Sequence, residues 1–188
     1  MLNLEENIRN LNELSKNLKL LADIDSAADL ICDSLQKNKP LLIFGNGGSA
    51  ADAMHMSGEL VGNFFIEREP LNVICLNTNT VVMSAWSNDY NYETVFARQV
   101  EAHGLDGGIC IGFSTSGNAS SVVKGLIHAK KIKMQTIGFT GNSGGKLKNI
   151  VDILINVPAS STPKIQELHL PIYHYICQKV EASFKNEN

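Results

Sequence analysis

The spacing of apolar positions along the chain changes after about residue 36. Up to that point they recur every three or four residues, which is typical of amphipathic helices, and the polar stretch Asp23–Ser26 predicts a break between two of them. Beyond it, apolar residues form short continuous runs at 40–44, 72–76, 108–113, 135–139 and 152–157. Runs without alternation are typical of strands buried on both faces of a parallel sheet. The sequence therefore predicts two N-terminal helices over 1–36, followed by five buried strands.

Helical patterns separate the five runs, and a long one follows the last run. They cover 49–61, 80–87, 92–103, 119–131 and 163–184. This alternation predicts an α/β fold, a three-layer αβα sandwich with a five-stranded parallel sheet that is doubly wound and flavodoxin-like. We expect residues 1–188 to form one domain with its α/β core over 40–157. Because such folds bind ligands at the carboxyl ends of strands, the loops there are the places to search for a site.

Composition narrows the possible partners. The formal net charge of −3 over 188 residues gives no attraction to nucleic acid or anionic lipid. No apolar stretch reaches 18 residues, and Glu5 and Glu6 argue against a secretory signal. The four cysteines are widely spaced, so we expect neither disulfides nor a cysteine zinc site. We therefore expect a cytoplasmic protein with no nucleic-acid or membrane partner.

The loop after the first predicted strand, residues 45–50, reads GNGGSA and opens a helix. Glycines let backbone N–H groups approach an oxyanion, and a helix N-terminus adds its positive end. The glycine spacing also fits a dinucleotide fingerprint, but the second strand ends at 75–78 without the acid that would bind ribose. We expect no nucleotide cofactor. A plain tight turn between strand and helix remains the alternative to an anion site.

The loop after the third strand, residues 114–121, reads STSGNASS and also opens a helix. Five hydroxyls beside free N–H groups favour a neutral phosphate site. The alternative is a simple N-cap, which needs one hydroxyl and does not account for five. The loop at 140–146, TGNSGGK, lacks the spacing of a nucleotide-binding P-loop and is interpreted as a turn before a helix.

Two histidines, a glutamate and a glutamine are candidates for the chemistry. His55 and Glu59 are four residues apart in one helical pattern, so the imidazole and the carboxylate share a face. Such a pair can hold a divalent ion or supply an acid and a base, although a surface ion pair has the same spacing. Gln166 and His174 can border one cleft from the last helix. The alternatives for them are a capping residue and a buried, hydrogen-bonded histidine.

Five blocks of the sequence together resemble the sugar isomerase (SIS) domain family, and within it the phosphoheptose isomerases that act on sedoheptulose 7-phosphate. The blocks are GNGGSAADAMHMSGEL, LNTNTVVMSAWSNDYNYETVFARQV, STSGN, TGNSGGKL and TPKIQELHLPIYH. The resemblance extends over almost the whole chain. One block alone would be a weak signal, but five blocks in the right order at the predicted strand ends are specific.

The resemblance implies a role for each candidate residue. Glu59 and His174 would be the catalytic acid–base pair. One zinc ion per subunit would be bound by His55, Glu59, Gln166 and His174. The substrate would contact Asn46, Gly47, Gly48, Ser49, Asn88, Asp89, Ser114, Thr115, Ser116 and Gln166, with Ser49 in the phosphate site. Taken alone, the sequence at 88–90 is that of a turn.

Two positions depart from the family pattern. Ala119 stands where many relatives have a serine, so one phosphate hydroxyl is missing or is supplied by Ser120. Pro163 stands where some relatives have an aspartate, so catalytic help from that acid is absent.

The resemblance also implies a reaction and an assembly. The reaction converts sedoheptulose 7-phosphate into D-glycero-D-manno-heptose 7-phosphate by proton transfer through an enediol, the first step of activated heptose biosynthesis for lipopolysaccharide or capsule. The assembly is a homotetramer with sites at subunit interfaces, where we expect the first and last helices. Two alternatives are a non-catalytic regulatory SIS protein of the type that binds the replication initiator, and an SIS isomerase for another sugar phosphate. The regulatory relative lacks the glutamate and the final histidine, which this chain has.

Overall fold

The computed structural model describes residues 4–185, so the first three and last three residues of the predicted domain lie outside it. Five parallel strands form one sheet in the order β2-β1-β3-β4-β5. They are β1 (Leu41–Gly45), β2 (Val73–Cys75), β3 (Ile109–Phe113), β4 (Gln135–Thr140) and β5 (Ile153–Asn156). The predicted doubly wound α/β fold is confirmed, because this strand order places crossover helices on both faces of the sheet.

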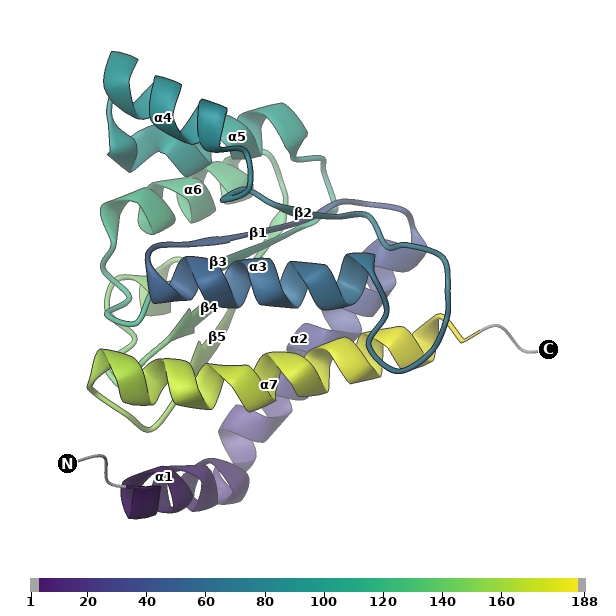
Figure 1. Ribbon diagram of the computed structural model, residues 1–188, viewed down its shortest axis with the longest axis vertical. Helices are drawn as coiled ribbons and strands as arrows, with labels where there is room; N and C mark the ends of the chain where they lie inside the picture. The colour runs from purple at the N-terminus through teal and green to yellow at the C-terminus, as the bar shows by residue number, and fades with distance from the viewer. Residues whose placement is uncertain (1–3, 186–188) are drawn as a thin grey trace.

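Helices cover both faces (Figure 1). They are α1 (Leu4–Lys16), α2 (Leu18–Gln36), α3 (Gly48–Val61), α4 (Thr80–Asp89), α5 (Val95–His103), α6 (Ser120–Lys131) and α7 (Thr162–Ser183), with short 3-10 turns η1 (Tyr92–Thr94) and η2 (Leu147–Asn149). α2, α3 and α7 pack on one face of the sheet, and α5 and α6 on the other. Strand residues alternate between the two layers, so Ile43 joins the first core and Phe44 the second.

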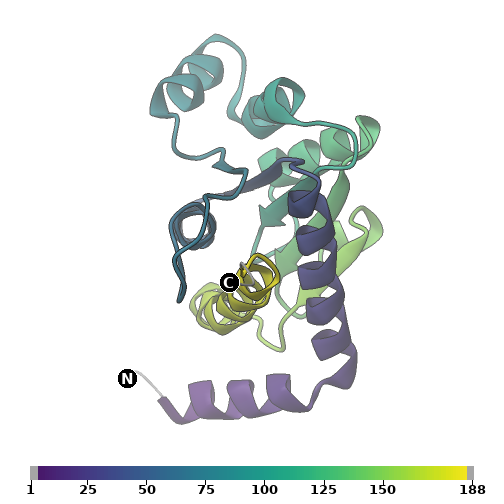
Figure 2. The same cartoon turned by 90° about the vertical axis from the view of Figure 1, so that its right-hand side faces the viewer.

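The two N-terminal helices meet at Asn17, and the predicted break at Asp23–Ser26 is wrong. The side-chain oxygen of Asn17 accepts a hydrogen bond from the backbone N–H of Leu20 at 3.1 Å and caps α2. α2 runs on through the predicted break because Ile24 and Ala27 are buried there, while the polar residues between them are not. Figure 2 shows α1 turning steeply away from α2 at the base of the molecule.

The register of the sheet brings the predicted loops to one edge. Gly45 pairs with Phe113, and Phe113 pairs with Phe139, so β1, β3 and β4 end side by side. Most predicted element boundaries lie within two residues of the observed ones. α4 ends at Asp89 and so includes the first two residues of the turn predicted at 88–90. The four cysteines are free and buried. Among residues 4–185, no helix combines the length and the apolar character that a membrane span requires.

Candidate active site

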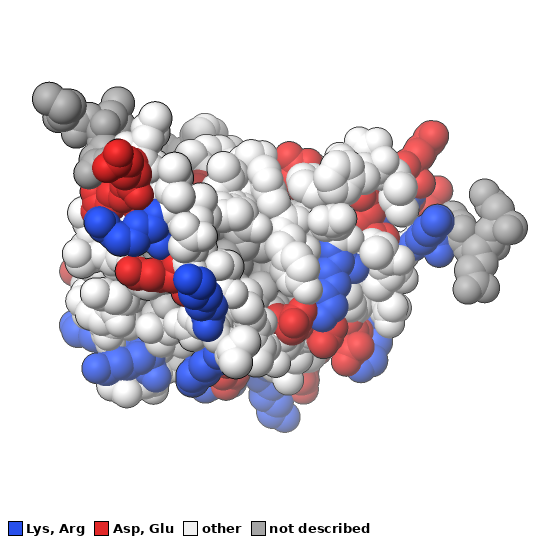
Figure 3. Space-filling view, turned by 90° about the horizontal axis from the view of Figure 1, so that it is seen from below, with Lys and Arg blue, Asp and Glu red and all other residues white. Residues whose placement is uncertain are grey.

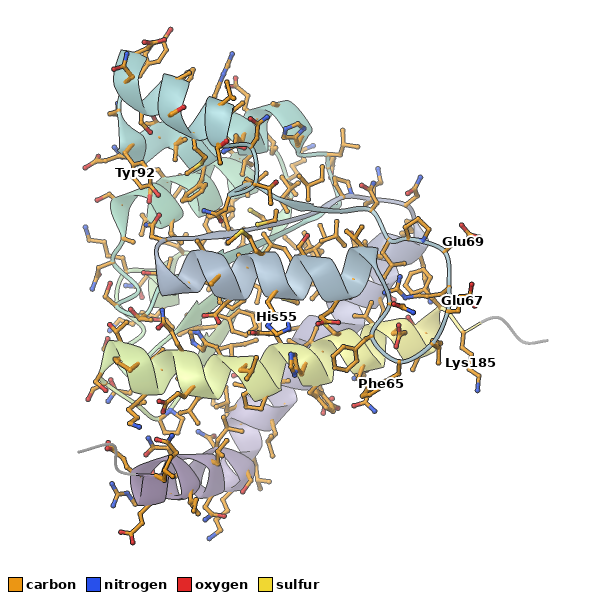
Figure 4. The ribbon with its side chains drawn as sticks, viewed as in Figure 1. His55, Phe65, Glu67, Glu69, Tyr92 and Lys185 are labelled. Carbon is orange, nitrogen blue, oxygen red and sulfur yellow. The ribbon has the colours of Figure 1, made fainter. Side chains whose placement is uncertain are left out.

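Three side chains meet in the seam between α3 and α7. Nε2 of His55 lies 3.0 Å from Oε1 of Glu59, one turn further along α3. From α7, Nε2 of His174 approaches the same nitrogen of His55 to 3.4 Å. Figure 4 shows His55 pointing from α3 toward α7. We call His55, Glu59 and His174 the His–Glu cluster.

Aromatic side chains flank this cluster. The hydroxyl of Tyr173 lies 3.0 Å from Nδ1 of His55, and the two rings meet edge to face at 5.4 Å. Phe64, from the loop after α3, packs against the ring of His174 at 5.3 Å. The cluster still faces solvent, since the side chains of His55 and Glu59 are 44% and 26% exposed. Aromatic side chains therefore cover one side of the cluster, and its other side is open to a ligand.

A buried carboxylate fixes the loop that carries Phe64. Glu181 of α7 accepts hydrogen bonds from the backbone N–H groups of Phe64 and Phe65, both at 2.7 Å, and lies 3.5 Å from Nε of Arg68. Arg68 donates in turn to the backbone carbonyl of Glu59 at 3.0 Å. The side chains of Arg68 and Glu181 are almost fully buried. These bonds tie the end of α3, the following loop and α7 into one support for the cluster.

Burial controls the protonation of the groups around the cluster. It lowers the pKa of His174; the nearby His55 lowers this pKa further, and Glu59 opposes both. Burial also raises the pKa of Asp52, three residues before His55 on α3, to about 6. The pKa of Tyr173 is raised by burial and, to a lesser extent, by the charge of Asp52. At neutral pH His174 is therefore uncharged, and the phenol of Tyr173 beside the cluster keeps its proton.

The cluster has the donor set and the spacing of a metal site. One nitrogen of each histidine and one carboxylate oxygen of Glu59 all lie within 4.8 Å of one another. A tetrahedral zinc ion holds nitrogen ligands at about 2.0–2.1 Å, which places two of them about 3.4 Å apart. The two imidazole nitrogens are 3.4 Å apart. The three donor atoms are therefore close enough together to bind a single divalent ion.

Gln166 lies at a different point of the α3–α7 seam. Its amide rests on Gly48, the first residue of α3, where a Cβ atom would clash with it. Gln166 precedes His174 by eight residues, which corresponds to about 12 Å of helix axis. Within one chain, the structure therefore places Gln166 beside the glycine loop and not in the His–Glu cluster.

The loop after β3 is shaped by its backbone. Gly117 has a φ of 65° and lies so close to Gly144 that a side chain at either position 117 or 145 would clash with the facing loop. The carbonyl of Gly117 accepts a hydrogen bond from the N–H of Lys146 at 2.9 Å. The loop at 140–146, predicted as a turn before a helix, leads into the short turn η2 and supports the hydroxyl-rich loop.

The five hydroxyls of that loop have separate surroundings. Ser114 is buried, and its Oγ accepts a hydrogen bond from the N–H of Ala119 at 3.4 Å. Ser121 is also buried, whereas Thr115 is half-buried and Ser116 and Ser120 are exposed. Exposed hydroxyls beside the N-terminus of α6 are available to an anion, while the buried ones hold the loop in shape.

Asn46 joins the glycine loop to the opposite layer. Its Nδ2 donates to Oγ of Ser121 at 2.9 Å, and its Oδ1 accepts from the hydroxyl of Tyr92 at 2.7 Å. Tyr92 belongs to η1, which precedes α5. The side chain of Asn46 is thus held by two neighbours at the mouth of the loop.

Three other predicted contacts are less well placed within one chain. Ser49 is only 3% exposed, so its hydroxyl faces away from solvent. Asn88 and Asp89 are exposed at the end of α4 and bond to each other at 2.9 Å. Figure 1 shows α4 on the side of the sheet opposite α7, away from the His–Glu cluster.

Sequence reasoning missed Tyr173, Phe64 and Tyr92. Each is an aromatic residue inside an apolar or turn-like stretch, where the ordinary interpretation is core packing. Tyr173 precedes His174 directly, but no spacing rule links it to a residue 118 positions earlier. Only the packing of α7 on α3 reveals that its hydroxyl meets His55.

Comparison with known proteins gives a consistent result. The SIS domain model matches residues 6–141. The phosphoheptose isomerase of Helicobacter pylori is 42% identical over 176 residues, covering 93% of this chain and 92% of that protein. The phosphoheptose isomerase of Geobacter sulfurreducens is 44% identical over 163 residues, covering 87% and 86%.

Solved structures agree with the sequence comparisons. The phosphoheptose isomerase of Neisseria gonorrhoeae superposes with a TM-score of 0.89 at 36% identity, covering 95% of both chains. That of Francisella tularensis gives a TM-score of 0.91 at 31% identity, covering 95% of this chain and 94% of the other. The likeness therefore spans the entire fold, including both helices that carry the His–Glu cluster.

Proposed function

The chain belongs to the phosphoheptose isomerases of the SIS domain family, and we propose that Glu59 and His174 carry out its chemistry. The enzyme is an aldose–ketose isomerase that converts sedoheptulose 7-phosphate into D-glycero-D-manno-heptose 7-phosphate in heptose biosynthesis. The observation that carries the assignment of residues is the meeting of a carboxylate and two imidazoles from distant segments at one solvent-facing point.

The reaction needs a base and an acid near two adjacent carbons. Glu59 removes a proton from C1 of the ketose, next to the carbonyl, and an enediol forms. His174 delivers a proton to C2, while the proton of the C1 hydroxyl is released and one is gained by the C2 oxygen, so that protons balance. His174 is mostly uncharged at neutral pH, and the fraction that carries a proton releases it readily because its pKa is lowered. The donor atoms of Glu59 and His174 lie within 4.8 Å of each other. A proton can therefore pass between them through one water after each turnover.

We propose one zinc ion per subunit, held by His55, Glu59 and His174 with Gln166 as a fourth ligand; Glu59 and His174 would exchange protons with the substrate only while released from the ion. When bound, zinc would polarise the carbonyl oxygen of the substrate. Because Gln166 lies about 12 Å along α7 from His174 of the same chain, a fourth ligand of this kind would come from a neighbouring copy. The proximity of the three donor atoms of His55, Glu59 and His174 supports the ion.

The loops at the carboxyl edge of the sheet would hold the distant phosphate. We propose contacts from the backbone of 46–48 and from the run 114–116, with the N-terminus of α6 supplying positive potential. Ser120 is exposed where Ala119 lacks a hydroxyl, so Ser120 is our candidate for the missing group. Binding energy from the phosphate orients the reacting end against the cluster. Ser49 would shape the phosphate site from beneath, because its hydroxyl is buried and its backbone N–H donates to the carbonyl oxygen of Asn46 at 3.0 Å. Asn88 and Asp89 would reach substrate across an interface.

An oligomer fits the surface around α1. This helix exposes Leu4, Ile8 and Leu11, and an apolar groove of about 560 Å³ lies between α1, α2 and α7. Figure 3 views this side and shows uncharged residues across its middle, with charged residues gathered toward both ends. Exposed apolar surface of this kind is typical of subunit contacts. We propose a cytoplasmic homotetramer in which the first and last helices form part of the interface.

A coupled assay on sedoheptulose 7-phosphate tests the proposal. The zinc-loaded protein should turn the substrate over, lose activity after treatment with a chelator, and recover it when zinc is restored. Full activity after verified removal of the metal would refute the zinc proposal but would not contradict the assignment as an isomerase. No turnover by the loaded protein, or much faster turnover of arabinose 5-phosphate offered in parallel, would contradict the assignment of substrate.

A further inference from the structure

The ring of His55 has two nitrogens with different surroundings. Nε2 faces the carboxylate of Glu59 at 3.0 Å and Nε2 of His174 at 3.4 Å. Nδ1 faces the hydroxyl of Tyr173 at 3.0 Å, and no other hydrogen-bond partner of Nδ1 is found among residues 4–185. A neutral imidazole carries its proton on one nitrogen only. The partner of Nδ1 therefore influences whether Nε2 presents a proton or a lone pair to the cluster.

Tyr173 is held firmly in this position. Its side chain is 1% exposed, and its ring packs edge-on against Phe113 at the end of β3 as well as against His55. α7 thus delivers the hydroxyl from a packed core position and not from a mobile surface side chain. A hydroxyl fixed in this way restricts rotation of the His55 ring about its χ angles.

We infer that Tyr173 is a positioning residue that accepts the Nδ1–H of His55 and so leaves the Nε2 lone pair free for the zinc ion that Glu59 and His174 would share. The hydroxyl oxygen accepts this proton while its own O–H is directed away from Nδ1. The arrangement would pre-organise His55 as a metal ligand before substrate binds.

The chain offers a matched control on the same helix. Tyr175 also donates its hydroxyl to a side chain, Oδ1 of Asp25 at 2.6 Å, but it is 45% exposed and bonds to α2. Tyr173→Phe and Tyr175→Phe each remove one oxygen and keep the ring. Only the first removes a partner of the cluster, so a difference between the variants isolates the role of the hydroxyl from a general loss of side-chain polarity.

The first test measures zinc affinity by competition with a chromophoric chelator. Loss of a hydrogen bond to a ligating histidine typically weakens metal binding about 10- to 100-fold, and we expect this for Tyr173→Phe. Tyr175→Phe should bind zinc as the wild type does. Equal zinc affinity in all three proteins would overturn the inference.

The second test needs no variant and reads the tautomer directly. Nitrogen-15 NMR of the zinc-loaded wild type should show His55 bound through Nε2, with a proton on Nδ1 that exchanges slowly with solvent. Coordination through Nδ1 would overturn the inference even if Tyr173→Phe failed to fold. The kinetic consequence rests on the proposed function: kcat on sedoheptulose 7-phosphate should fall in Tyr173→Phe and not in Tyr175→Phe. An inactive wild type would contradict the proposed function alone, because metal affinity and tautomer are measured without substrate.

Discussion

The two working regions of this molecule are built in different ways. At the carboxyl edge of the sheet, the loops depend on backbone shape: Gly48 admits the amide of Gln166, and Gly117 takes a positive φ against the facing loop. In the His–Glu cluster, shape comes from side chains that approach across the α3–α7 seam, such as His55 and His174, 119 positions apart. The loop region is specified by a few consecutive residues, whereas the cluster exists only once two helices have packed.

This difference separates binding from chemistry. In our proposal the loops would provide N–H groups and hydroxyls to an unreactive phosphate, so changes there should affect mainly KM. The cluster would provide the groups that exchange protons with the substrate, so changes there should affect mainly kcat. The comparison can be tested by substituting one region at a time.

The largest effect is expected from Glu59→Gln, which keeps the size of the side chain and removes the base. We expect kcat to fall about 10³-fold or more while KM changes little, because general base catalysis is lost and phosphate binding is not. Glu67→Gln is the matched control, since Glu67 is exposed on the loop after α3 (Figure 4). Steady-state kinetics of both variants provide the measurement. Near-normal kcat in Glu59→Gln would mean that the base has been misassigned.

A smaller effect concerns the helix that the two regions share. His169 of α7 is fully buried between Phe113 and Phe139, and its Nε2 lies 3.3 Å from the carbonyl oxygen of Thr140. Burial lowers the pKa of His169 to about 4. Between that value and the ordinary histidine pKa of about 6.5, the unfolded chain takes up a proton that the folded chain refuses, so stability falls as pH decreases.

From pH 7 to pH 5, this linkage should cost the wild type about 2 kcal/mol in free energy of unfolding. Asp52 acts in the opposite direction over part of this range, because its raised pKa favours protonation of the folded state. The contribution of His169 is therefore read from the difference between the wild type and His169→Gln in urea titrations at both pH values. The same pH dependence in both proteins would show that His169 does not titrate as described.

The smallest effect is expected in the hydroxyl loop. Ser116→Ala should raise KM for sedoheptulose 7-phosphate about 10-fold with kcat nearly unchanged, which corresponds to the loss of one hydrogen bond to a charged group. Ser26→Ala is the control, because the Ser26 hydroxyl bonds to the carbonyl of Ala22 on the surface of α2. A fall in kcat as large as that of Glu59→Gln would remove the distinction between the two regions.

The same contrast explains what the sequence could predict. The five strands and both loops were predictable because continuous apolar runs and consecutive glycines are local features. The break at 23–26 was misplaced because the polar residues there lie on the surface of a continuous helix. The boundary between α1 and α2 lies at Asn17, which caps α2. The hydroxyls of Ser49, Ser114 and Ser121 could not be recognised as buried, because burial depends on the packing of α3 and α6.

The contacts that hold the His–Glu cluster in place could not be predicted from residue spacing either. His55 and Glu59 are one helical turn apart and could be paired from the sequence, but the roles of His174 and Gln166 came from resemblance. The contacts of Glu181 with the backbone of 64–66, and of Tyr173 with His55, connect residues more than 110 positions apart. Such contacts follow from tertiary packing, which no short motif records.

The most direct measurement of the central claim is isomerisation of sedoheptulose 7-phosphate in D₂O, followed by NMR of the heptose phosphate. Proton transfer by side chains of an open cluster predicts deuterium at C2 of the product in the wild type, and the absence of product labelling above background in Glu59→Gln. Rapid conversion with only hydrogen at C2 would indicate direct transfer between the two carbons. That result, or full labelling by Glu59→Gln, would contradict the role given to the His–Glu cluster.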